Sequence, residues 1–203
     1  MGSMISSSLK PVITRLINPV ARFAVKIGLT PNAITVVGAC GVIGSAGWFY
    51  PQEEYFWGTL AIVFFALSDL FDGAMARISE RGANPWGGFL DSTIDRITDS
   101  AITIALIISL IAKGDTLAYL GLLTLVTGFL IPYIRAKAES FGIYCSVGIA
   151  ERTERLIIIL TSIGLHGLQV PYVLAGGLWL MAILGVITVF QRIFVVRRGL
   201  VEN

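Results

Sequence analysis

The chain has 203 residues, of which 55% are apolar and only 14% are charged. Ordinary soluble domains carry about 25% charged residues, so this chain lacks the charge needed to cover a water-facing surface. The sparse charge, with a net value of +2, also excludes a disordered chain and a chain that wraps nucleic acid. The composition therefore predicts an all-α integral membrane protein, in which each crossing of the bilayer takes about 20 residues.

The first segment is polar and basic. Residues 1–3, which precede a second methionine, are interpreted as cloning residues and set aside. In residues 4–29 the apolar side chains recur at helical spacing while the basic ones largely fall elsewhere on the helix. This pattern predicts an amphipathic helix lying in the membrane interface. Residues 30–203 are then expected to form one membrane domain.

Six apolar runs follow, and each is expected to cross the membrane as a helix: residues 34–49, 55–78, 90–112, 116–134, 156–168 and 172–194. Thr30, Pro31 and Asn32 form a helix-start signal before the first run. Pro132 is expected to bend or open the fourth run near its end. Four glycines at three-residue spacing predict a groove for close helix packing: Gly38, Gly41, Gly44 and Gly47.

The basic residues indicate an orientation. Thirteen of the fifteen Lys and Arg residues fall on one side of the six predicted crossings, with Lys113 opposite and Arg96 near an inner helix end. Basic residues collect on the cytoplasmic side of membrane proteins. Both termini are therefore expected in the cytoplasm, with the chain crossing the cell (inner) membrane six times.

Five aspartates lie beside the second and third runs: Asp69, Asp72, Asp91, Asp95 and Asp99. An ionised carboxylate at the centre of a membrane helix costs about 2.5–3.5 kcal/mol, so this group requires compensation by water, cations or an interfacial position. Helical spacing places Asp69 and Asp72 on one stripe and Asp91 and Asp95 on another. Carboxylates without His or Cys favour Mg²⁺, Mn²⁺ or Ca²⁺ over zinc, and two such ions would balance four negative charges.

The run Asp69-x2-Asp72-Gly73-x2-Ala76-Arg77-x9-Gly87-x3-Asp91-x3-Asp95 resembles the signature of the CDP-alcohol phosphotransferases. The resemblance implies an enzyme of phospholipid biosynthesis that displaces CMP from a CDP-linked alcohol, usually CDP-diacylglycerol, with a second alcohol. It also implies six transmembrane helices, an active site facing the cytoplasm, and a homodimer surrounded by membrane lipids.

The resemblance further assigns roles to individual residues. Two Mg²⁺ ions, for which Mn²⁺ could substitute, would be held by Asp69, Asp72 and Asp91 and by Asp69, Asp91 and Asp95. Asp95 would also be the general base. The positions matching those that hold CDP-diacylglycerol are Thr30, Pro31, Asn32, Ala33, Gly73, Ala76, Arg77, Asn84 and Gly87.

Three arginines lie at the predicted cytoplasmic ends of three helices: Arg135, Arg155 and Arg192. Converging guanidinium groups would bind a dianionic phosphate monoester. The arrangement resembles the bacterial phosphatidylinositol phosphate synthases within the family, which implies inositol 1-phosphate as the acceptor. Glycerol 3-phosphate, the acceptor of phosphatidylglycerophosphate synthases, is the alternative because it carries the same phosphate.

Two questions stay open, which are the class of protein and the role of Asp99. Intramembrane carboxylates also mark cation and proton transporters, although these would string the carboxylates along the membrane normal. Asp99 continues the stripe of Asp91 and Asp95 by one turn. It is expected either to support the metal site or to form a structural ion pair, with Arg96 or with another helix.

Overall fold

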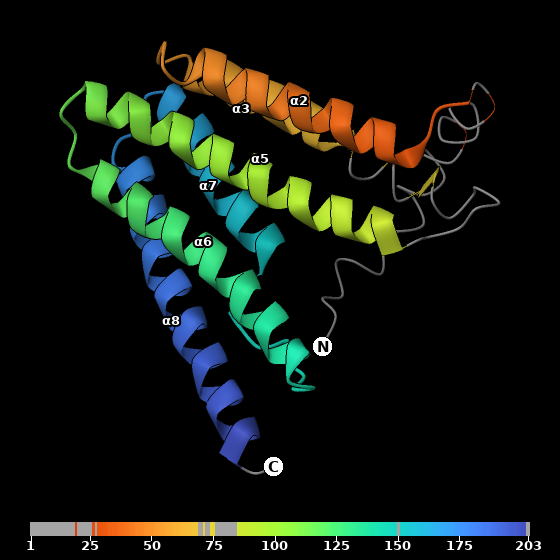
Figure 1. Cartoon of the computed structure of the whole chain (residues 1–203). Coiled ribbons are helices and arrows are strands. Elements are labelled where there is room, and N and C mark those ends of the chain that lie inside the picture. Colours follow the sequence, from red (N-terminus) through yellow and green to blue (C-terminus); the bar gives the residue numbers. More distant parts are fainter. Residues whose placement is uncertain are drawn as a thin grey trace. The chain divides into compact units, whose positions relative to one another are not determined.

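The structure is a computed structural model that describes residues 19, 26, 28–68, 71, 74–75, 85–149 and 151–201. These residues form six helices (Figure 1): α2 (Pro31–Phe49), α3 (Tyr55–Ala66), α5 (Pro85–Ala112), α6 (Leu117–Ser140), α7 (Arg152–Gly167) and α8 (Val173–Val201). The predicted all-helical class is confirmed. The predicted interfacial helix falls in residues 4–29, nearly all of which lie outside the described residues.

Three of the described helices, α2, α6 and α8, are long and apolar enough to cross a membrane. Their length and composition are those of membrane-spanning helices. Helix α3 is apolar but has only 12 described residues. Helices α5 and α7 are less apolar than α2, α6 and α8, because each carries charged residues in its first half.

Contacts between residues divide the chain into two compact units. The first comprises Met1–Val42 and Ile62–Asp95, and the second comprises Ile43–Ala61 and Arg96–Asn203. The first unit thus contains the start of α2 and the start of α5. The second contains α6, α7 and α8 complete.

Helix α2 begins where the sequence predicts it. The Thr30 side-chain oxygen accepts a hydrogen bond from the backbone N–H of Ala33 at 3.2 Å. Threonine is a favoured N-cap because its hydroxyl satisfies one of the unpaired N–H groups of the first turn. Pro31 follows as the first helical residue, where its missing N–H costs nothing.

The predicted glycine groove on α2 is present in only half of its length. A Cβ atom at Gly38 would collide with Ser68, and one at Gly41 would collide with the Phe65 ring. These two glycines therefore permit close helix packing within the first unit. At Gly44 and Gly47 a Cβ atom would meet no described atom within 4 Å, so nothing in the described chain requires glycine there.

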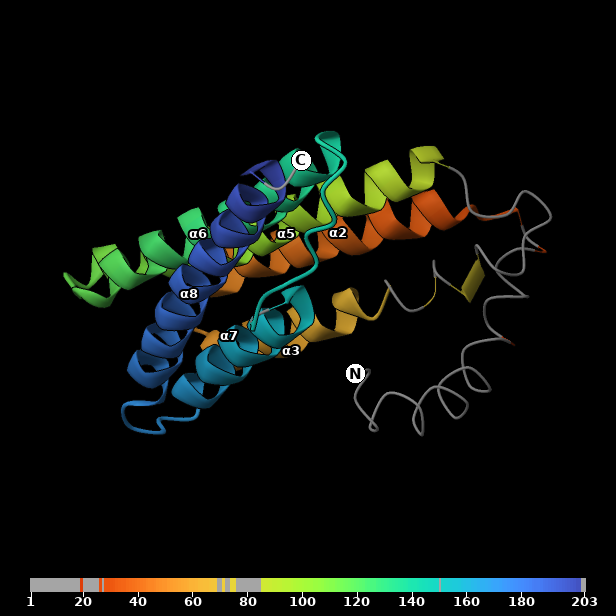
Figure 2. The ribbon, with the colours of Figure 1, turned by 90° about the horizontal axis from the view of Figure 1, so that it is seen from below.

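In the second unit, α8 packs against both α6 and α7, as Figures 1 and 2 show. Small residues allow this approach. Gly185 of α8 faces Thr127 of α6, and Gly177 of α8 faces Ser162 of α7. Membrane helices associate through such close contacts because lipid supplies little hydrophobic drive between them.

Replacing Gly177 with alanine is expected to destabilise the protein. The new Cβ atom would lie 2.5 Å from Ser162 Cβ, which cannot move without the α7 backbone, and such overpacking costs about 1–3 kcal/mol. Gly176 is the matched control, since a Cβ atom there meets no described atom within 4 Å. Thermal unfolding in detergent should show a lower Tm for Gly177→Ala and an unchanged or higher Tm for Gly176→Ala. Equal Tm values for the two variants would contradict this packing.

Polar side chains join the C-terminal end of α5 to the start of α3 and the residues just before it. Tyr55 and Ser109 share a buried hydrogen bond of 2.6 Å between their hydroxyl oxygens. Lys113 lies beside them, and its ammonium group is 2.9 Å from Glu53 Oε2. The hydrogen bond donated to Glu53 raises the pKa of Lys113. This ion pair belongs to the second unit and involves none of the residues predicted to form the site.

Candidate active site

Helix α5 carries the part of the aspartate motif that the structure describes. Gly87, Asp91 and Asp95 lie at four-residue intervals on it, so they occupy one face in successive turns. Asp91 is exposed and Asp95 is half-buried. The predicted stripe is therefore present, with its two carboxylates in the first unit.

The other motif residues lie outside the described residues: Asp69, Asp72, Gly73, Ala76, Arg77 and Asn84. Within the described ranges, no three His, Cys, Asp or Glu side chains gather into a metal site. Asp91 and Asp95 fit the predicted ion because both offer carboxylate oxygens, which hard divalent cations such as Mg²⁺ and Mn²⁺ prefer.

The predicted CDP-binding segment from Thr30 to Ala33 forms the first turn of α2. Thr30 and Ala33 are exposed, and Pro31 and Asn32 are half-buried. A helix N-terminus presents unpaired N–H groups and a partial positive charge, both of which suit a phosphate group. In this turn the Ala33 N–H is bonded to Thr30 and Pro31 has no N–H, so the partial positive charge of the helix end is what suits a phosphate group here.

The three predicted acceptor-site arginines belong to the second unit and differ sharply in environment. Arg155 of α7 is only 8% exposed, and Arg192 of α8 is 5% exposed. Arg135 of α6 is exposed, and its Nε donates to Glu139 Oε1 at 2.9 Å. Arg192 is within electrostatic range of both Arg155 and Arg135. The structure therefore buries Arg155 and Arg192 and leaves Arg135 exposed and paired with Glu139.

Arg192 also links α8 to α6 and to the segment between α6 and α7. Its Nη1 donates to the carbonyl oxygen of Ile131 at 2.6 Å, and its Nε donates to that of Val147 at 2.9 Å. Two of its five N–H donors thus attach α8 to α6 and to the segment that leads into α7. Beside Ile131, Pro132 lies inside α6, which continues beyond it to Ser140.

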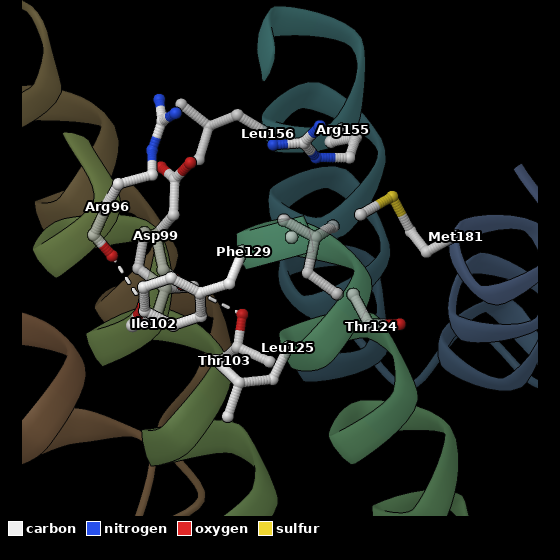
Figure 3. A pocket seen from close by; sticks show the side chains of 13 residues that line it. Arg96, Asp99, Ile102, Thr103, Thr124, Leu125, Phe129, Arg155, Leu156 and Met181 are labelled. Atoms are coloured by element: carbon white, nitrogen blue, oxygen red, sulfur yellow. Dashed lines mark hydrogen bonds between the residues drawn. The ribbon is translucent and has the colours of Figure 1, made fainter. Parts of the chain in front are cut away.

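A cavity in the second unit is lined by four helices (Figure 3): Arg96, Asp99 and Thr103 from α5, Thr124 and Phe129 from α6, Arg155 from α7, and Met181 from α8. Arg96 and Asp99 occupy the turn of α5 that follows Asp95. Of the two roles expected for Asp99, support of the metal site or a structural ion pair, the structure contains an ion pair with another helix: Asp99 Oδ2 lies 3.4 Å from Arg152 Nε of α7. Helix α5 therefore carries the motif aspartates in one stretch and cavity-lining charges in the next.

Known proteins match the chain over nearly its whole length. Residues 28–194 match the family model of CDP-alcohol phosphatidyltransferases. A phosphatidylinositol phosphate synthase from Streptomyces avermitilis is 37% identical over 98% of this chain and 85% of its own length. One from Mycobacterium tuberculosis H37Rv is 38% identical over 92% of this chain and 88% of its own.

Solved structures agree with the sequence matches. A crystal structure of the Mycobacterium tuberculosis phosphatidylinositol phosphate synthase with CDP-DAG bound has a TM-score of 0.85 and 39% identity, covering 90% of this chain and 94% of that one. The crystal structure of the same enzyme in complex with manganese and citrate has a TM-score of 0.83 and 38% identity, covering 89% of this chain and 88% of that one. The chain therefore belongs to the CDP-alcohol phosphatidyltransferase family.

Proposed function

We propose that this enzyme transfers the phosphatidyl group from CDP-diacylglycerol to inositol 1-phosphate, giving phosphatidylinositol phosphate and CMP. The observation that carries the proposal is the match to phosphatidylinositol phosphate synthases over most of both chains, one of them solved with CDP-DAG bound. Membership in a family of transferases decides against the transporter alternative.

The motif aspartates would hold two divalent ions, Mg²⁺ or Mn²⁺. Asp69, Asp72 and Asp91 would bind one, and Asp69, Asp91 and Asp95 the other. The shared face of Asp91 and Asp95 on α5 supports this assignment, as does the manganese complex of a relative. Bound ions of this kind neutralise the charge that develops on a departing phosphate.

In the proposed reaction, a hydroxyl oxygen of the acceptor attacks the lipid-side phosphorus of CDP-diacylglycerol. The bond from that phosphorus to the CMP oxygen breaks, and CMP leaves with the electron pair. Asp95 would accept the hydroxyl proton. An aspartate with an ordinary pKa near 4 is a weak base at pH 7, so its contribution depends on orientation toward that hydroxyl.

Substrate binding would be divided between two sets of residues. The nucleotide side of CDP-diacylglycerol would be held by Thr30, Pro31, Asn32, Ala33, Gly73, Ala76, Arg77, Asn84 and Gly87. The acceptor phosphate would be held by Arg135, Arg155 and Arg192. The burial of Arg155 and Arg192 supports this, because buried guanidinium groups need an anion to offset their loss of water.

For the chain as a whole we propose one membrane domain over residues 30–203, preceded by the interfacial segment 4–29 after cloning residues 1–3. The domain would cross the inner membrane six times with both termini and the active site in the cytoplasm, and would pair as a homodimer. The placement of thirteen of fifteen basic residues on one side supports the orientation.

The purified protein tests the function directly. CMP release is measured with CDP-diacylglycerol, Mg²⁺ and one acceptor at a time: inositol 1-phosphate, glycerol 3-phosphate or free inositol. We expect release with inositol 1-phosphate alone, its loss on adding EDTA, and its return with excess Mg²⁺. Release with glycerol 3-phosphate alone would assign the alternative acceptor, and no release with any alcohol would overturn the proposed activity.

A further inference from the structure

Four charged side chains gather in the second unit where α5 and α7 meet the cavity. Arg96 and Asp99 come from α5, and Arg152 and Arg155 come from the first turn of α7. Arg96, Asp99 and Arg155 line the cavity, and Figure 3 shows the Asp99 carboxylate beside the Arg96 side chain. In the described chain, Asp99 is the one acidic residue lining this cavity. Among the described residues, the cluster thus brings three arginines and one aspartate together.

Asp99 joins the two helices. Its Oδ2 is 3.4 Å from Arg152 Nε, and both side chains are half-buried at 27% and 28% exposure. Its other oxygen, Oδ1, is buried and accepts no hydrogen bond from the described residues. An ion pair of this kind is screened less than a surface pair because water reaches it poorly. The carboxylate therefore links the helix of the aspartate motif to the first turn of α7.

Arg155 depends on that link. It is 8% exposed, and the charges acting on it are those of Asp99, Arg96, Arg192 and Arg152. The three arginines repel Arg155 and one another, while Asp99 attracts it. Arg152, being less buried, can move its charge toward water when its partner is removed. Arg155 lies one turn further along α7 and faces the cavity, so its position is sensitive to how that first turn is held.

We infer that Asp99 is a positioning residue for acceptor binding: by pairing with Arg152 it holds the first turn of α7 so that Arg155 faces the acceptor phosphate. The inference rests on the proposed function, since it takes Arg155 as a phosphate ligand. Asp99 lies outside the aspartate motif and is assigned here to neither metal nor base. The guanidinium group of Arg155 is suited to a dianionic phosphate monoester.

Kinetics of Asp99→Asn test the inference because two effects of the change oppose each other. Removing a negative charge near the site would by itself attract phosphate more strongly and lower KM for inositol 1-phosphate. Loss of positioning raises it, and we expect a rise of about ten-fold, as for one lost charge-assisted contact. The Ki of inorganic phosphate as a competitor should rise in parallel. KM for CDP-diacylglycerol and the Mg²⁺ concentration for half-activation should stay unchanged.

Three further variants complete the design. Asp99→Glu retains the charge and should recover part of the lost affinity. Arg152→Gln breaks the same ion pair from α7, so it should raise KM by a similar factor, and the double variant should be no worse than either single one. Glu53→Gln is the matched control, because it removes a carboxylate paired to Lys113 at 2.9 Å and should leave every constant unchanged.

An unchanged or lower KM for inositol 1-phosphate in Asp99→Asn contradicts the inference, as does a shift confined to Mg²⁺ activation. A rise in KM without a rise in the Ki of phosphate also overturns it, because Asp99 would then contact the sugar ring. If Asp99→Asn does not fold, Arg152→Gln decides by the same comparison. Failure of the unmodified protein to release CMP with inositol 1-phosphate would instead overturn the proposed function.

Discussion

Asp95→Asn is expected to lower kcat about 10³-fold, within the range of about 10²–10⁴ that a general base contributes. Asparagine keeps the size of the side chain and one oxygen, but it cannot accept the hydroxyl proton. KM for CDP-diacylglycerol should change much less, because Asp95 is not among the residues predicted to hold the nucleotide. Initial rates of CMP release over a range of both substrates measure the two constants.

Glu54→Gln serves as the control, since it makes the same chemical change at an exposed residue before α3. Its rate should equal that of the unmodified protein. Binding of Mn²⁺, followed by electron paramagnetic resonance, separates the two roles given to Asp95. A variant with near-normal kcat and intact metal binding would show that Asp95 is not the base.

Arg155→Met should raise KM for inositol 1-phosphate by ten-fold or more, about the effect of losing a buried charge-assisted contact. Methionine fills much of the same volume, so the cavity wall should be retained while the charge is lost. Arg155→Lys should recover only part of the affinity, because an ammonium group cannot form the two parallel hydrogen bonds of a guanidinium group. KM for CDP-diacylglycerol should be little affected by either change.

Arg197→Gln is the control for Arg155→Met, because Arg197 is exposed on the last turns of α8 and is assigned to no site. Folding is checked by size-exclusion chromatography and Tm in detergent. A normal KM for inositol 1-phosphate in folded Arg155→Met would remove Arg155 from the acceptor site. A Tm lowered equally in Arg155→Met and Arg155→Lys would show that the charge is not what stabilises this part of α7.

Local signals predicted much of the fold. Thr30 and Pro31 mark the start of α2 by capping chemistry, which depends only on neighbouring residues. Two other helix boundaries differ from the prediction. Helix α5 begins at Pro85 rather than near residue 90, since proline suits a first helical turn, and α8 continues to Val201 past its apolar run.

The site was predictable to the extent that it follows helical spacing. The stripe of Asp91 and Asp95 is a property of one helix, so the sequence reveals it. The contacts of Arg192 are different, because its hydrogen bonds reach residues 45 and 61 positions away. Likewise, the pairing of Asp99 with Arg152 joins two helices far apart in the sequence. Such contacts arise only from tertiary packing, which residue spacing does not encode.

The central claim is that an alcohol, not water, receives the phosphatidyl group. Its most direct test is mass spectrometry of the lipid formed from CDP-diacylglycerol and inositol 1-phosphate by the purified, Mg²⁺-loaded protein, with CMP measured alongside. We predict one phosphatidylinositol phosphate for each CMP. Phosphatidic acid formed one for one with CMP would show that water is the acceptor and would contradict the proposed function.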